Sequence, residues 1–190
     1  GGVSKAFPAG DALVYLCAVV VLVAGIGLIW RRTAAPAARL LLAWLLLWTL
    51  ASKVRFIALA PLTEGTYQTL GENMVLIAGA WVLYAWFAGG WDQRHLAFAT
   101  GDRGVRVARV IYALAMIAFG LSHFFYLQLT APLVPAWLPW HVGWAYFTGA
   151  AYLAAGLAIL LGVCARLAAV LSAVQMGGFT LLIWVPMAVA

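Results

Sequence analysis

Long apolar runs separated by short polar segments dominate the pattern along this chain. Six of the runs are about 20 residues long, the length that a helix needs to cross the hydrocarbon core of a membrane. They cover residues 11–30, 38–59, 72–90, 107–128, 141–162 and 166–189. The pattern predicts an all-α fold, a polytopic bundle of six transmembrane helices.

Arginine and proline positions predict the break after the first run. Arg31 and Arg32 follow it directly. Pro36 comes next, and the residue before a proline disfavours the α region, so Ala35-Pro36 is expected to prevent the helix from continuing. We therefore expect residues 31–39 to form a loop.

Prolines also mark the later breaks. Three of them lie between residues 129 and 140 and predict a non-helical connector there. Pro186 falls near the end of the sixth run. The remaining long loops are expected at 56–71 and 91–109.

Basic residues are concentrated in three of the segments between the runs. Eight of the eleven lysine and arginine residues lie there, namely Arg31, Arg32, Arg39, Arg94, Arg103, Arg106, Arg109 and Arg166. Short basic loops stay on the cytoplasmic side of a bilayer. We therefore expect 31–39, 91–109 and 163–166 inside, with both termini and the connectors at 56–71 and 129–140 outside.

Composition agrees with a membrane protein. The chain is 67% hydrophobic and 8% charged, which excludes an ordinary soluble domain. The basic cytoplasmic loops account for the net charge of +6, as the positive-inside rule predicts. Nucleic acid is therefore not an expected partner, whereas membrane lipids are. Five of the ten tryptophans lie near predicted helix ends, as in an interfacial belt: Trp30, Trp91, Trp137, Trp140 and Trp184.

A repeat is visible within the chain. Pro8, Tyr15 and Ala24-Gly25 match Pro139, Tyr146 and Ala155-Gly156 at a constant shift of 131 residues. This register predicts a four-helix unit, present as helices two to four of one copy and one to three of the next. A rival register pairs Arg39 and Ser52 with Arg109 and Ser122 at a shift of 70, with fewer supporting positions. We expect a first partial unit at 1–91, a basic cytoplasmic loop at 92–108 and a second partial unit at 109–190, with three membrane helices in each unit.

Residues 109–186 resemble a DoxX-like membrane protein. The resemblance rests on Arg109, Phe119-Gly120-Leu121-Ser122-His123-Phe124, Leu133-Val134-Pro135-Ala136-Trp137-Leu138-Pro139, Trp144-Ala145-Tyr146-Phe147-Thr148-Gly149, Gly156, Arg166-Leu167-Ala168-Ala169 and Leu182-Ile183-Trp184-Val185-Pro186. Such proteins often carry a doubled four-helix unit, in agreement with the repeat. The first copy departs from the pattern because it lacks a His-Phe helix and has Lys53 and Arg55 where the second copy is apolar. We therefore expect the natural protein to be longer by at least one helix at each end.

The resemblance also implies a function. Relatives of this type are similar to the membrane subunit of thiosulfate:quinone oxidoreductase, which implies quinone contact and a bacterial inner (cytoplasmic) membrane. The chain shows no nucleotide-binding loop, catalytic triad, metal cluster or haem-ligand spacing, so we expect no catalysis by the chain alone. It is thus predicted to be an accessory membrane subunit of an oxidoreductase assembly, with other membrane subunits as partners.

Two other functions fit the same pattern. A purely structural subunit of a larger membrane complex, which binds lipid or pigment, needs only the broad apolar exterior. A transporter of small solutes or metals built on repeats fits less well, because the charges lie near the helix ends rather than at the midplane.

His123 is the main candidate for chemistry at the outer side, because ionisable groups at membrane depth are costly unless they have a partner. It could ligate a metal, relay a proton or donate to a quinone carbonyl. The alternative is a histidine that only hydrogen-bonds a neighbouring helix. Two histidines do not make a metal site, so no metal is predicted. The candidate quinone or polar-ligand residues are Ser122, His123, Tyr126, Trp137, Trp140, His141 and Trp184.

Further charged residues form two groups. An outer cluster of Lys53, Arg55, Glu64 and Glu72 departs from the positive-inside trend, and either pairing among these residues or an anion site explains it. The second group is expected to anchor phospholipid headgroups on the cytoplasmic side. It comprises Arg31, Arg32, Arg109 and Arg166.

Overall fold

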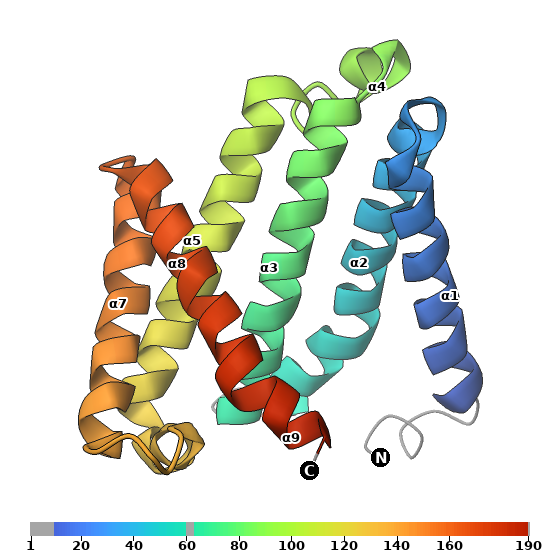
Figure 1. Cartoon of the computed structure of the whole chain (residues 1–190). Helices are drawn as coiled ribbons and strands as arrows, with labels where there is room; N and C mark the ends of the chain where they lie inside the picture. The colour runs from blue at the N-terminus through green and yellow to red at the C-terminus, as the bar shows by residue number, and fades with distance from the viewer. Residues whose placement is uncertain (1–9, 60–62, 190) are drawn as a thin grey trace. The chain divides into compact units, whose positions relative to one another are not determined.

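The computed structural model describes residues 10–59 and 63–189, and the regular secondary structure in that part of the chain is entirely helical, without strands (Figure 1). The elements are α1 (Gly10–Ile29), α2 (Arg31–Leu59), α3 (Glu64–Phe87), α4 (Gly90–His95), α5 (Gly101–Phe125), α6 (Leu127–Thr130), η1 (Ala131–Leu133), α7 (His141–Leu161), α8 (Ala165–Phe179), η2 (Thr180–Trp184) and α9 (Val185–Val189). Six helices among the described residues are long and apolar enough to cross a membrane. The predicted all-α fold with six such helices is confirmed.

The chain divides into two compact units. Unit 1 comprises residues 1–51 and 79–108, and unit 2 comprises residues 52–78 and 109–190. This division reflects packing in space, whereas the expected repeat at 1–91 and 109–190 concerns sequence similarity. The repeat and its boundaries therefore stay a prediction.

The predicted loop at 31–39 is wrong, because α2 begins at Arg31 and includes Pro36. Only Trp30 separates α1 from α2, and its carbonyl accepts hydrogen bonds from the N–H groups of Thr33 and Ala34. Pro36 removes one helical hydrogen bond. Burial of Ala34 and of two further alanines at positions 37 and 38 offsets this loss, since buried apolar side chains stabilise the fold.

Close contact between α1 and α2 depends on small residues. A Cβ atom at Gly27 would lie 2.8 Å from the Cβ of Ala37, so only glycine fits there without a shift. Farther along the same pair, the indole N–H of Trp44 donates to the Sγ of Cys17 over 3.4 Å. The sequence alone did not reveal this contact, because the two residues are 27 positions apart.

The expected loop at 91–109 contains a short helix, and α5 begins at Gly101 rather than 107. The helix α4 buries one acidic residue, Asp92, whose exposed fraction is 1%. Its carboxylate accepts hydrogen bonds from Arg39 Nη2 at 2.8 Å, Tyr84 Oη at 3.0 Å and the Gly89 N–H at 3.1 Å. The Arg39 guanidinium also lies over the Trp91 ring, 5.3 Å from its centroid. This cluster fastens α4 to α2 and α3 within unit 1.

Because the pKa of Asp92 is lowered, we expect the stability that this cluster contributes to fall only at acidic pH. Burial raises the pKa, but the hydrogen bonds from Arg39, Tyr84 and Gly89 outweigh burial and hold it below its usual 3.8. A lowered pKa adds stability that is complete above the ordinary value and is lost as the pH falls through the folded-state value. We expect the difference in thermal midpoint between the wild type and Asp92→Asn to be constant from pH 7 to about 4 and to shrink only below that. Differential scanning fluorimetry in detergent measures it, and a difference that already shrinks near pH 6 would contradict the assignment.

The third helix begins earlier than expected. The sequence predicted a connector at 56–71, yet α2 extends to Leu59 and α3 begins at Glu64. Thr63 caps this helix: its carbonyl accepts the Thr66 N–H at 3.1 Å, and the two hydroxyl groups lie 2.8 Å apart. The first N–H groups of a helix lack partners within the helix and need local acceptors. Polar residues can therefore form the first turns of α3.

Unit 2 is held together by close approach of α5 and α7. Cβ atoms at Gly120 and Gly156 would lie 2.9 Å from the backbone oxygens of Gly149 and Ala113, respectively. Small residues at such contacts let two membrane helices pack backbone to backbone. Ala115, Met116, Phe119 and Tyr152 form a buried core cluster beside this contact.

A connector and a distorted helix complete unit 2. The expected connector at 129–140 is largely non-helical, although its first residues extend through α6 and η1 to Leu133. Between α8 and α9, the hydrogen-bonding pattern widens to a π-helix at Thr180–Trp184. Pro186 explains the widening, because it cannot donate a hydrogen bond to the carbonyl of Leu182. Pro186 lies in α9, near the end of the last predicted run, as expected.

Candidate functional site

A cavity of about 280 Å³ lies in unit 2, lined by side chains from α3, α5, α6, α7 and α8 and from the segments η1 and η2. Its polar lining consists of Gln68, Glu72, His123, Thr130, Thr148, Tyr152, Thr180 and Trp184. The apolar lining is Phe119, Leu133, Val134, Ala145, Met176, Phe179 and Ile183. Apolar and aromatic surface combined with hydrogen-bonding groups is typical of a small-molecule site.

His123 lies near the end of α5, with its imidazole fixed by its own helix. Its Nδ1 is 2.8 Å from the carbonyl oxygen of Phe119, and because a carbonyl only accepts, Nδ1 carries the proton. In the neutral ring Nε2 is then an acceptor, so neutral His123 is not the donor to a ligand carbonyl. The ring lies beside Tyr152, with a centroid separation of 5.7 Å.

Tyr152 is the most distinctive group of the cavity. Its exposed fraction is 4%, and its ring packs against those of Phe119, His123 and Phe179 at centroid distances of 5.8, 5.7 and 6.3 Å. No described residue forms a hydrogen bond with its hydroxyl group. Because Tyr152 lines the cavity, its hydroxyl group is available to donate a hydrogen bond to an acceptor atom bound there.

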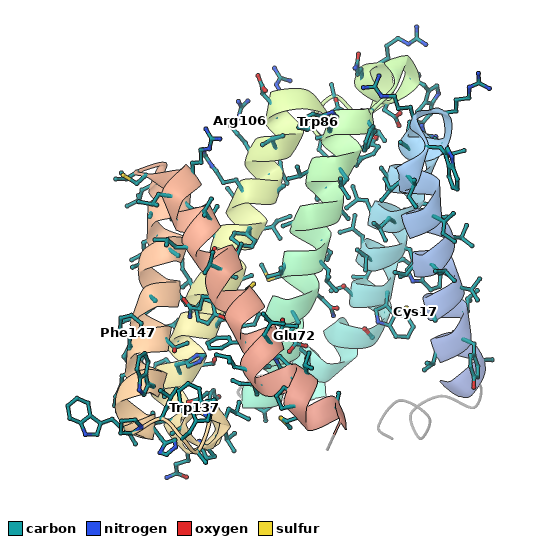
Figure 2. All side chains as sticks on the ribbon, in the orientation of Figure 1. Cys17, Glu72, Trp86, Arg106, Trp137 and Phe147 are labelled. Atoms are coloured by element: carbon teal, nitrogen blue, oxygen red, sulfur yellow. The ribbon has the colours of Figure 1, made fainter. Side chains whose placement is uncertain are left out.

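Glu72 and Gln68 bring polar chemistry from α3 to the same cavity. Gln68 Nε2 donates to Glu72 Oε1 over 3.2 Å, one helical turn apart. Figure 2 labels Glu72 on α3. The Glu72 carboxylate can accept hydrogen bonds from a polar headgroup, and the Gln68 amide can both donate and accept them.

The π-helical segment η2 contributes three lining residues, Thr180, Ile183 and Trp184. Single turns of π-helix are frequent at functional sites, where the extra residue displaces a side chain from its regular helical position. In unit 2 this displacement coincides with the cavity wall.

The cavity gathers some of the residues singled out in the sequence and leaves others apart. His123, Trp184 and Glu72 share it. Ser122 and Tyr126 instead line an apolar groove on α5, where the buried Ser122 hydroxyl donates to the Phe119 carbonyl at 2.8 Å.

The connector residues also lie elsewhere. His141 lines a second groove of unit 2 and shares no cavity with His123. Trp137 and Trp140 are 70% and 85% exposed and line neither the cavity nor the grooves described here, and Figure 2 labels Trp137 at the connector end of unit 2. No three His, Cys, Asp or Glu side chains among the described residues are placed to hold a metal ion.

The remaining charged candidates divide in the same way. The side chains of Lys53, Arg55 and Glu64 lie outside the described residues, so their expected pairing stays a prediction. The four expected headgroup anchors, Arg31, Arg32, Arg109 and Arg166, are exposed.

Tyr152, Gln68 and Asp92 were not recognised from the sequence. Tyr152 is a polar group in the middle of an apolar run, which is a general signal of function in a membrane helix. Gln68 fell in a segment expected to be a loop. Asp92 lies two residues from Arg94 in a segment rich in arginine. An acidic residue in such a segment could have indicated an ion pair.

Comparison with known proteins supports the resemblance. Residues 104–185 match the family model DoxX, close to the predicted span of 109–186. No curated protein and no solved structure matches the chain. The six apolar helices and this match agree, and the chain is therefore an integral membrane protein whose residues 104–185 are DoxX-like.

Proposed function

We propose that this protein is an accessory membrane subunit of an oxidoreductase assembly and holds a quinone headgroup in the cavity around Tyr152. The observation that carries the proposal is the Tyr152 hydroxyl, which belongs to a buried side chain that lines the cavity and has no hydrogen-bond partner among the described residues. A quinone carbonyl oxygen accepts hydrogen bonds and cannot donate them, so it suits the Tyr152 hydroxyl as its donor.

The small volume of the cavity favours a quinone headgroup over a larger ligand. Its volume of about 280 Å³ lies just below the range for small-molecule sites, roughly 300–1,000 Å³. Aromatic rings of Phe119, Tyr152, Phe179 and Trp184 offer flat apolar surface against which a planar ring can stack. The chain would thus bind and orient the quinone, while electron transfer would belong to a partner subunit.

Orientation in the membrane forms part of the proposal. We place the arginine-rich segments on the cytoplasmic side of a bacterial inner membrane, following the positive-inside rule. His123 and the connector after α6 would then face the outer side.

Tyr152→Phe tests the function most directly. We expect this change to weaken binding of a quinone with a short tail by about five- to tenfold, because a neutral hydrogen bond contributes about 1 kcal/mol or slightly more. Isothermal titration calorimetry of the protein in lipid nanodiscs would measure the dissociation constant. The matched control is Tyr146→Phe on the same helix, since Tyr146 is exposed and does not line the cavity. Equal affinity of Tyr152→Phe and wild type would refute the proposed site.

Purification of the whole assembly from native membranes separates this function from a structural role. Stoichiometric quinone, lost when Tyr152 is replaced, would support the proposal. Stable partner subunits without any bound quinone would instead favour a subunit that only contacts lipid and protein.

A further inference from the structure

A second, larger groove of about 880 Å³ adjoins the cavity in unit 2. Its walls come from α6, η1, the connector up to Ala136, the start of α7 and the chain around Pro186. Apart from Gln128 and His141, every side chain that lines it is apolar.

The groove and the cavity are neighbours because they share three lining residues, Leu133, Val134 and Ile183. All three side chains are aliphatic, so the junction of the two spaces is lined by apolar groups. The groove on α5 and the groove at the turn between α7 and α8 share no lining residue with the cavity.

We propose that this groove holds the first isoprenoid units of the same quinone, so that the molecule enters and leaves along it. The inference rests on the proposed function. A headgroup and its tail are covalently joined, so a headgroup in the cavity requires an open apolar path next to it. The groove offers that path where it adjoins the cavity at Leu133, Val134 and Ile183.

Lipid is as apolar as the groove, so the tail gains little from the hydrophobic effect itself. The groove would act through shape: it lets the headgroup reach Tyr152 without forcing the tail against protein. Three prolines in its walls, Pro132, Pro135 and Pro186, restrict the backbone there and help to keep the path open.

Filling the groove tests this proposal. Val142→Trp and Met187→Trp each place a large side chain at a position that lines the groove and not the cavity. We expect both variants to weaken binding of a quinone with two isoprene units by about tenfold, because a crowded site resists an added group. Binding of the tail-free quinone should stay within twofold of wild type, roughly the spread expected for unrelated surface changes.

Leu129→Trp is the matched control, since Leu129 lies on α6 with an exposed side chain that lines neither space. Unchanged affinity of the tailed quinone in both groove variants would overturn the inference, and so would an equal loss for both quinones. Failure of the proposed function has a different signature, because the tail-free quinone would then not bind to the wild type at all.

Discussion

Gly149→Leu is expected to destabilise unit 2 by about 3 kcal/mol or more. A Cβ atom at this position would lie 2.7 Å from the Cβ of His123 and 3.1 Å from the carbonyl oxygen of Gly120. Backbone cannot move aside as a flexible side chain can, so α5 and α7 would have to separate. The separation would also displace His123 and Tyr152 from the cavity.

Thermal unfolding in detergent and quinone titration of the surviving protein would measure both effects. Gly178→Leu is the matched control, since no heavy atom lies within 4 Å of a Cβ built there. Leucine also favours a helix over glycine by somewhat under 1 kcal/mol, so the control should be neutral or slightly more stable. A Gly149→Leu protein as stable as this control would show that α5 and α7 do not meet as described.

Asp92→Ala is expected to lower the stability of unit 1 by about 3 kcal/mol. The change removes the acceptor for Arg39, Tyr84 and the Gly89 N–H together, and it leaves the buried Tyr84 hydroxyl without its partner. Arg39 keeps part of its hydration because its side chain is 47% exposed, so the loss falls at the lower end of the range for buried ion pairs.

The thermal midpoint in detergent should fall by roughly 6–12 °C, as expected for a chain of this length. Asp102→Ala is the matched control, because Asp102 is an exposed aspartate of the same arginine-rich segment. A double-mutant cycle with Arg39→Ala isolates the ion pair: the two changes together should cost less than their sum. Strict additivity would contradict a direct interaction between Arg39 and Asp92.

Six apolar runs were enough to predict six spanning helices, because the membrane imposes length and hydrophobicity on each helix separately. The DoxX resemblance was also available from the sequence, since it rests on motifs such as Phe119-Gly120-Leu121-Ser122-His123-Phe124 that lie within single segments. His123 and Trp184 could be selected in the same way, as polar or interfacial residues near helix ends. Each of these inferences depends on local composition and spacing.

Tertiary contacts decided the rest. Pro36 lies inside a helix whose neighbouring alanines are buried, with Ala37 close to Gly27 of α1, and local rules for proline do not include that burial. Asp92 is buried because Arg39, 53 positions away in sequence, donates to it. Tyr152 and Glu72 share a cavity only because α3 and α7 both reach it in unit 2. The sequence alone thus determined which segments cross the membrane, and packing between distant segments determined which side chains meet.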